Sequence, residues 1–197
     1  FWLCRDLGCG YIASMVGGAI YGFAGYIGWA GTNCFLMSCL WVPVALLFSL
    51  RVNRGERPLA NGALCGAALG AGFLMGHHNV PIYLVVVMGV LWAWLLVRQR
   101  RDRRIWAAAA ACLVVWLLVP AVQTLPTIEY GRQALRWVGT PEPLTWKDPV
   151  PYSVHAEYSL QARSLPGLVV PGFAIHASPF IGIAALALAA AAVWRRW

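Results

Sequence analysis

The sequence predicts an all-α integral membrane protein with about six transmembrane helices and one long outer loop between the fifth and the sixth. Three observations favour this fold class. Of the 197 residues, 60% are hydrophobic and only 11% are charged, whereas soluble domains carry about 25% charged residues. Apolar stretches of about 20 residues, the length that crosses a bilayer, recur along the chain. The arginines are gathered in the connections on one side of these stretches.

The apolar stretches place the spans at about 9–29, 33–50, 60–77, 80–97, 105–122 and 177–194. Each is expected to be a helix, because backbone groups inside lipid find no water to bond. Residues 1–197 are therefore interpreted as a single polytopic membrane region, with an outer loop over about 123–176. The opening residues FWLCRDLG contain no positively charged segment followed by a cleavage site, so they do not predict a signal peptide. We expect the chain to be an internal fragment of a longer protein.

Glycine spacing predicts how some of these helices pack. Gly62, Gly66 and Gly70 are four residues apart, and Gly18 and Gly22 repeat that spacing in the first span. Small residues at this spacing let helix backbones approach closely in lipid. We interpret these glycines as packing positions.

The distribution of charge predicts the orientation. The basic residues that precede the first span, link spans two and three, link spans four and five or follow span six are Arg5, Arg51, Arg54, Arg57, Arg98, Arg100, Arg101, Arg103, Arg104, Arg195 and Arg196. The acidic residues on the same side are Asp6, Glu56 and Asp102, so this side carries the whole formal charge of +8. The positive-inside rule makes it cytoplasmic, and the segment RQRRDRR is interpreted as an anchor near anionic lipid headgroups rather than as a nucleic-acid site.

The outer loop of about 123–176 is rich in proline, which disfavours long helices within it. One short stretch, TIEYGRQALRW at 127–137, predicts an interfacial helix with Thr127 as its cap. Tyr130 and Trp137 suit the headgroup boundary. A loop of this length on a compact protein is more often functional than idle.

The cysteine and histidine side chains are candidate metal ligands. The cysteines at 4, 9, 34, 39, 65 and 112 all lie within or beside apolar segments, which favours packing over a disulfide framework or a zinc site. Adjacent His77 and His78 would point about 100° apart on a helix and are poor joint ligands for one ion. We predict no metal site, although a divalent metal stays open as a cofactor. The stretch GFLMGHHNVPIY is interpreted first as a tight outer hairpin, with Asn79 as a cap or turn residue and Pro81 in the first turn of the next helix.

The segment PAVQTLPTIEYGRQALR at 120–136 contains the candidate binding residues. Gln123 lies where the fifth span is expected to leave the membrane, and Glu129, Tyr130, Arg132 and Arg136 follow. Arginines at an outer surface suit phosphate or pyrophosphate, which the planar guanidinium binds in a bidentate way. The alternative is a solvated amphipathic helix with local ion pairs. No Walker A, GxGxxG, HExxH or GxSxG pattern is present.

The order of several stretches resembles a known family. These stretches are Leu-Gly at 7–8, GGAIYGFAGY at 17–26, LWVPVALLFSL at 40–50, GFLMGHHNVPIY at 72–83, PAVQTLPTIEYGRQALR at 120–136 and SPFIGIAALALA at 178–189. They are similar to bacterial YfhO-type membrane proteins, a branch of the GT-C superfamily of integral membrane glycosyltransferases. The positions that match the family pattern are Trp41, Pro43, Gly76, His77, Tyr83, Gln123, Pro126, Thr127 and Glu129. The chain departs from that pattern where His78 and Asn79 replace Pro-Gln.

The resemblance implies sugar transfer at the outer face of a bacterial cytoplasmic membrane, from a polyprenyl-phosphate donor to an extracytoplasmic acceptor glycan or polymer. It also implies a catalytic aspartate in an outer loop upstream of Phe1, so no catalytic residue is assigned within this chain. His77 and His78 are expected to line an outer cavity beside Gln123 and Glu129, and Arg132 or Arg136 to stabilise the departing lipid phosphate.

Two alternatives stay open at this point. The first alternative is a transporter that flips a lipid-linked sugar. The predicted spans hold almost no charges away from their ends, which disfavours ion coupling. The second alternative is a noncatalytic membrane scaffold whose outer loop binds a partner.

Overall fold

The computed structural model describes residues 1–24, 38–76, 79–156, 162–170 and 182–196. These residues form helices and connecting turns, and they contain no strand beyond one isolated bridge between Arg136 and Leu144. The prediction of an all-α chain is therefore confirmed for the part that the structure describes. The chain divides into two compact units, one of residues 1–18 and 30–123 and the other of residues 19–29 and 124–197.

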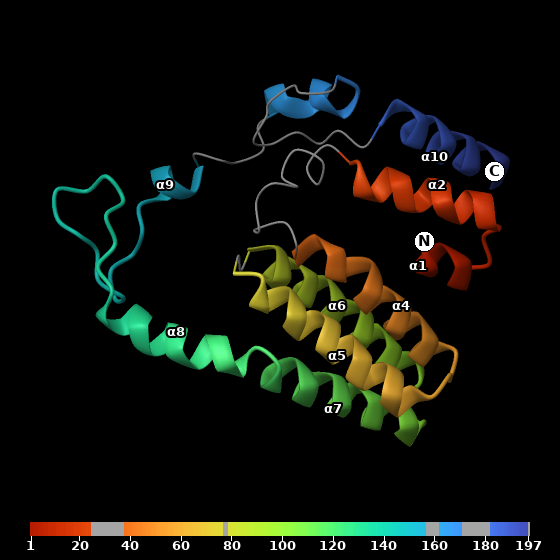
Figure 1. Cartoon of the computed structure of the whole chain (residues 1–197), viewed down its shortest axis with the longest axis horizontal. Helices are drawn as coiled ribbons and strands as arrows, with labels where there is room; N and C mark the ends of the chain where they lie inside the picture. Colours follow the sequence, from red (N-terminus) through yellow and green to blue (C-terminus); the bar gives the residue numbers. More distant parts are fainter. Residues whose placement is uncertain (25–37, 77–78, 157–161, 171–181, 197) are drawn as a thin grey trace. The chain divides into compact units, whose positions relative to one another are not determined.

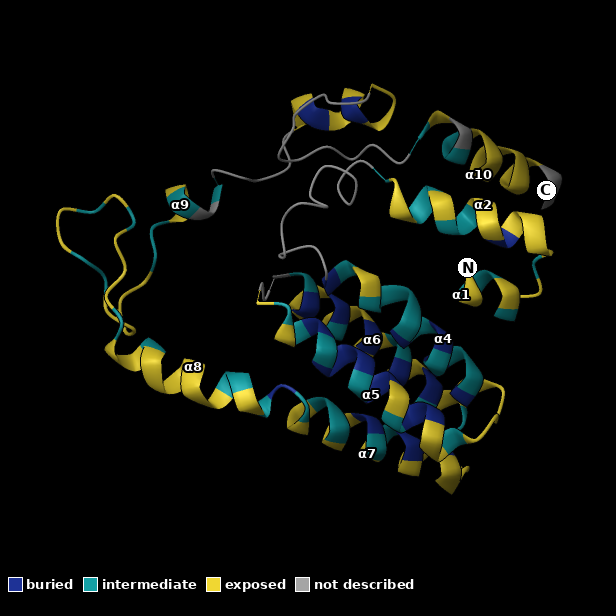
Figure 2. Ribbon diagram, in the orientation of Figure 1, coloured by how far each residue is buried: buried dark blue, intermediate teal, exposed yellow. Residues whose placement is uncertain are grey.

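The first unit contains a four-helix bundle formed by α4 (Trp41–Asn53), α5 (Pro58–Leu74), α6 (Asn79–Arg98) and α7 (Arg103–Leu118) (Figure 1). Its core consists of small and apolar side chains from all four helices: Ala45, Val52, Cys65, Ala68, Leu69, Leu84, Met88, Trp92, Leu95, Ile105, Ala108 and Cys112. Figure 2 shows the buried positions gathered along α5. Cys65 and Cys112 are thus packing residues, as predicted for the cysteines.

The closest helix contact lies between α5 and α7, where the glycines of α5 face the backbone of α7. An ideal Cβ on Gly62 would lie 2.9 Å from Cα of Ala108, and one on Gly66 would lie 3.0 Å from Cα of Cys112. A Cβ on Gly70 would lie 2.7 Å from Cβ of Val119. Real Cβ atoms do not approach so closely, so these glycines are what permits the contact. The predicted packing role of Gly62, Gly66 and Gly70 is confirmed.

Local sequence explains where these helices begin and end. Pro58 and Pro81 occupy the first turns of α5 and α6, where a missing N–H costs little. Asp102 caps α7, because its carboxylate accepts a hydrogen bond of 2.8 Å from the backbone N–H of Arg104. Gly76, with φ of +87°, follows α5 and adopts a backbone conformation that favours glycine.

Two short helices precede the bundle. In α1 (Trp2–Asp6), the Asp6 carboxylate forms an ion pair of 3.0 Å with Arg51 of α4 and pairs with Arg54 as well. In α2 (Tyr11–Gly22), Gly17 lies against the Cys4 sulfur and Gly18 lies 3.2 Å, measured from an ideal Cβ, from the backbone nitrogen of Phe1. An ideal Cβ on Gly22 meets open space, so a packing role is observed for Gly18 and not for Gly22.

The remaining helices are α8 (Ala121–Gln133), α9 (Tyr152–Ala156), the 3₁₀ helix η2 (Ala162–Leu168) and α10 (Ile183–Arg196). The stretch expected to be an outer loop from residue 123 therefore contains more helix than predicted. Pro126 lies inside α8, where it removes one intrahelical hydrogen bond without ending the helix. Thr127 also lies inside α8, so its predicted role as a helix cap is wrong.

Candidate functional site

Five of the predicted binding residues lie on or just after α8. Gln123 is in the first turn of α8, where its backbone N–H donates to the carbonyl of Pro120 at 2.9 Å, and it belongs to the first unit. Glu129, Tyr130 and Arg132 are in the last turns, and Arg136 follows the helix; all four belong to the second unit. His77 and His78 lie outside the described residues.

Spacing on α8 determines which of these side chains share a face. Glu129 and Arg132 are three residues apart and are therefore neighbours on the helix surface. Tyr130 and Arg132 are two residues apart, which places them about 160° from each other around the axis. The structure thus gathers a carboxylate and a guanidinium on one face of α8, with the phenol on the other side.

The chain after α8 folds back onto the helix. Arg136 and Leu144 exchange two backbone hydrogen bonds, each of 2.8 Å. The ring of Trp146 then lies against Gly131, where an ideal Cβ would be 2.7 Å from Cζ3 of the indole. Gly131 therefore leaves room for Trp146, and the bridge fixes the backbone that presents Arg136.

A second turn in this loop is held by Asp148. Its carboxylate accepts hydrogen bonds from the backbone N–H and the hydroxyl of Thr145, at 2.7 and 2.6 Å. The backbone N–H of Asp148 donates back to the carbonyl of Thr145 at 3.2 Å. Because these bonds favour the charged form, the Thr145 hydroxyl and then its N–H hold the pKa of Asp148 below its usual value.

The candidate residues in the second unit are open to solvent. Glu129, Tyr130, Arg132 and Arg136 are all exposed, and among the described residues no carboxylate lies within ion-pair distance of either arginine. Two guanidinium groups without an acidic partner can each offer a planar pair of donors to a phosphate. No general base is assigned among these residues.

Sequence reasoning missed the residues that shape this region. Gly131, Leu144, Trp146 and the Thr145–Asp148 pair determine the course of the loop, and none was singled out. The one sequence signal for a close neighbour is Gly131 inside a helical pattern. Glycine in a helix costs about 1 kcal/mol relative to alanine, so its presence there indicates a packing reason.

Metal ligands are not gathered in the part of the chain that the structure describes: it holds no group of three or more His, Cys, Asp or Glu side chains arranged around one point. Cys4, Cys9, Cys65 and Cys112 form no disulfide among the described residues. The side chain of His155 and the whole of His176 are outside the description.

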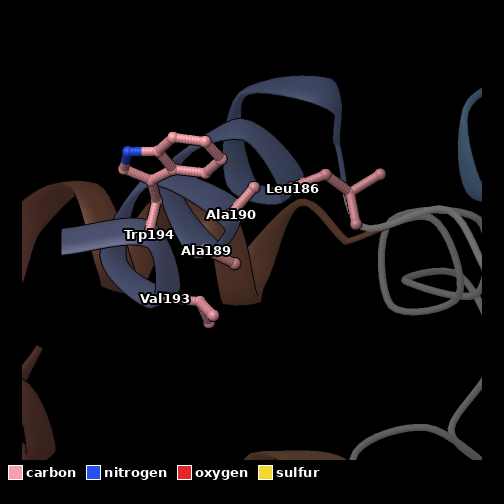
Figure 3. Close-up of a pocket in the computed structure, with 5 residues that line it drawn as sticks. All are labelled: Leu186, Ala189, Ala190, Val193 and Trp194. Atoms are coloured by element: carbon pink, nitrogen blue, oxygen red, sulfur yellow. The ribbon is translucent and has the colours of Figure 1, made fainter. Parts of the chain in front are cut away.

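An apolar hollow of about 870 Å³ lies along α10, and none of the predicted residues is among those that line it. Its lining consists of Leu186, Ala189, Ala190, Val193 and Trp194 (Figure 3). The first four repeat at helical spacing, so they form one apolar stripe. The described residues that line this hollow are apolar, so they suit apolar contact.

One described helix, at Val80–Arg98, is long and apolar enough to cross a membrane, and a second crossing results if α7 and α8 are counted together. That pair is bent by 53° at its break. Stretches within α4, α5 and α10 are apolar but shorter. Comparisons with protein-family models, with curated proteins and with solved structures find no match to this chain.

Proposed function

We propose that this chain is a multi-pass segment of a bacterial cytoplasmic membrane protein, with its arginine-rich connections in the cytoplasm. We further propose that the protein transfers a sugar from a polyprenyl-phosphate donor to an extracytoplasmic glycan or polymer. The membrane assignment is the broader claim, and the proposal of sugar transfer depends on it.

The exposed face of α6 is the observation that carries the membrane assignment. Its outward side chains include Ile82, Val86, Val87, Val90 and Val97, each between 48% and 74% exposed. The opposite face, with Leu84, Met88, Trp92 and Leu95, is buried in the bundle. A helix on the surface of a soluble bundle presents polar side chains to water. Here both faces are apolar, and no charged residue lies between Val80 and Val97, which fits a helix with lipid on its outer side.

The neighbouring helices support the same assignment. Leu113, Val114, Leu117 and Leu118 of α7 are exposed as well. At 1.5 Å per residue, a 20-residue helix such as α6 is about 30 Å long, which equals the thickness of the hydrocarbon core. The α5 helix has 17 residues, at the lower end of the range for a spanning helix.

The charges of the bundle support the orientation. The α4–α5 connection, with Arg54 and Arg57, and the α6–α7 connection, with Arg98 to Arg104, lie at the same end of the bundle (Figure 1). Gln99 joins the two connections by donating to the side-chain oxygen of Asn53 at 3.0 Å. Basic residues at one end of apolar helices favour the cytoplasmic side.

Sugar transfer is supported by the resemblance in motif order and by two arginines of the second unit that have no acidic partner among the described residues. Arg132 and Arg136 offer guanidinium groups suited to the phosphate that leaves when the sugar is transferred. Glu129 lies beside Arg132 on α8 and suits a sugar hydroxyl as a hydrogen-bond acceptor. No residue of this chain is proposed as the catalytic base.

Sugar transfer is tested in membranes that contain the complete gene product, with a polyprenyl-phosphate sugar whose sugar is radiolabelled. The double variant R132Q/R136Q is expected to lower transfer to the acceptor fraction by about tenfold or more, since each charge-assisted bond contributes about 1.5–3 kcal/mol. The matched control is K147Q/R163Q, which removes two other exposed cations from the second unit.

Undiminished transfer by R132Q/R136Q would remove both arginines from the mechanism. Movement of the labelled lipid across vesicles, with no labelled acceptor formed by the unaltered protein, would overturn the transferase and favour a transporter.

A further inference from the structure

The α6–α7 connection forms a small concave site at the arginine-rich end of the bundle. Arg98, Gln99, Arg100, Arg101 and Asp102 line a hollow of about 400 Å³, and we name these five residues the arginine-loop site. The loop is held in place from outside, because Gln99 donates to both the backbone carbonyl and the side-chain oxygen of Asn53, at 3.3 and 3.0 Å. The hollow is therefore shaped by fixed backbone rather than by a free chain.

The acidic groups near this end are already engaged. Asp6 pairs with Arg51 and Arg54, and Glu56 lies 3.4 Å from Arg54. The carboxylate of Asp102 caps α7 through the N–H of Arg104. Among the described residues, no carboxylate lies within ion-pair distance of the following arginines: Arg57, Arg98, Arg100, Arg101, Arg103 and Arg104. Their charge is available to an anion from outside the chain.

Two tryptophans flank the arginine-loop site. The Arg98 guanidinium lies 5.1 Å from the ring centroid of Trp94, which is half-exposed on α6. Trp106 of α7 is also about half-exposed and donates its indole N–H to the carbonyl of Arg100 at 3.1 Å. Tryptophans with an apolar ring and an engaged N–H are typical of the level of lipid headgroups.

We propose that the arginine-loop site binds the phosphate of an anionic phospholipid of the cytoplasmic leaflet. This inference rests on the membrane assignment proposed above. Arg100 and Arg101 supply the charge, and planar guanidinium groups match the oxygens of a phosphodiester. Trp94, Trp106 and the exposed apolar face of α6 lie where the glycerol and acyl chains of that lipid would continue. This apolar surrounding favours a lipid over a free phosphate or an RNA, which would bring no apolar part.

The test uses the whole chain reconstituted into nanodiscs of neutral phosphatidylcholine, with or without about one-fifth phosphatidylglycerol. Insertion is measured first, as co-elution of protein with the disc in both lipids. Lipid retained by the protein after gentle detergent extraction is then counted by native mass spectrometry. We expect the ratio of retained phosphatidylglycerol to retained phosphatidylcholine to exceed the ratio in the bilayer. The variant R100Q/R101Q is expected to lower that ratio about 30-fold, since each of the two arginines near the surface contributes about 1 kcal/mol.

Three comparisons make the result specific. The control K147Q/R163Q removes the same charge elsewhere and is expected to keep the enrichment. The conservative variant R100K/R101K is expected to keep part of it, because charge remains while bidentate geometry is lost. Neither competitor is expected to displace the lipid: inorganic phosphate at millimolar concentration, or a short single-stranded RNA at micromolar concentration.

Protein that inserts equally into both discs without enriching phosphatidylglycerol overturns the lipid site and leaves the membrane assignment standing. Enrichment that survives R100Q/R101Q, or displacement by RNA or free phosphate, also overturns the site. Protein that enters neither disc overturns the membrane assignment and the lipid site together.

Discussion

The α5–α7 contact and the α8 region both use a glycine to admit a neighbour, but the neighbours differ in kind. Gly66 of α5 lies against the backbone of Cys112, and Gly131 of α8 lies against the ring of Trp146. A helix backbone cannot give way without separating two helices, whereas an indole ring can rotate about its side-chain bonds. The bundle is thus held by contacts that tolerate little change, and the loop after α8 by contacts that yield.

The two regions also differ in their side-chain hydrogen bonds, which are buried in the bundle and exposed in the loop after α8. In the bundle, the indole N–H of Trp92 donates to the hydroxyl of Ser49 at 3.1 Å, and that hydroxyl lies 3.3 Å from the Cys65 sulfur. These groups are buried. In the loop, Thr145 and Asp148 bond each other at the surface. A buried bond that loses one partner leaves an unsatisfied group, whereas an exposed one is replaced by water.

Gly66→Ala is expected to have the largest effect. The added Cβ would lie 3.0 Å from Cα of Cys112, so the helices must separate, at a cost of about 1–3 kcal/mol in unfolding free energy. Gly89→Ala on α6 is the matched control, because its Cβ would meet nothing within 4 Å. That control should stabilise the helix by about 0.5–1 kcal/mol. Circular dichroism during unfolding in mixed detergent micelles measures both changes in unfolding free energy. If Gly66→Ala stabilised the protein as Gly89→Ala is expected to do, the close contact between α5 and α7 would be contradicted.

Ser49→Ala is expected to have the second-largest effect on the unfolding free energy. It leaves the buried indole N–H of Trp92 without its acceptor, which costs about 1–2 kcal/mol. The variant Trp92→Phe in the same background removes the donor as well and should cost less than the sum of the two single changes. Additive single and double changes, measured by the same unfolding assay, would show that the bond contributes nothing.

Gly131→Ala is expected to change the unfolding free energy by less than about 0.5 kcal/mol, because alanine favours the helix while displacing only the indole ring. The local result should still be visible. Labelling with 5-fluorotryptophan, with the resonance assigned by Trp146→Phe, should show a shifted ¹⁹F signal for Trp146 alone. An unshifted signal would mean that Trp146 does not lie on Gly131.

Acidification is expected to have the smallest effect, confined to the turn at Asp148. Because hydrogen bonds from Thr145 lower the pKa of Asp148, the turn gains stability above the usual pKa of an aspartate, and this gain disappears as the pH falls through the lowered value. The amide resonance of Thr145 should shift over that acidic range. In Asp148→Asn the titration should vanish, and an unchanged titration there would assign the shift to another group.

Helix positions in the bundle were predictable, because each follows from an apolar stretch bounded by charged or helix-breaking residues. The packing of Gly62, Gly66 and Gly70 was predictable for the same local reason: their spacing places them on one face. The residues that this face contacts were not predictable, since the spacing of glycines in α5 does not indicate that Ala108 and Cys112 lie opposite them. The Ser49–Trp92 bond joins residues far apart in sequence and leaves no periodic trace.

The region after α8 was harder to predict because local rules compete there. Proline at 126 argued against a helix, yet α8 continues through it, so the expected cap at Thr127 was wrong. The fold-back of the chain depends on Gly131 meeting Trp146, a contact between one small and one large residue that follows no repeat. Arg132 and Arg136 lie four residues apart in the sequence, but their relation to Leu144 and Trp146 required the structure.

The central claim is that the outer face of α6 meets lipid, and Val90 tests it most directly. Val90 is 68% exposed near the middle of α6, whose residues from Val80 to Val97 carry no charge. In a variant with all six native cysteines replaced, a nitroxide label on Val90→Cys can be probed in reconstituted bilayers by electron paramagnetic resonance. The account predicts strong relaxation by oxygen, which dissolves in lipid, and almost none by a water-soluble nickel chelate, with the reverse for a label on Lys147→Cys. Strong relaxation of the Val90 label by the nickel chelate would contradict it.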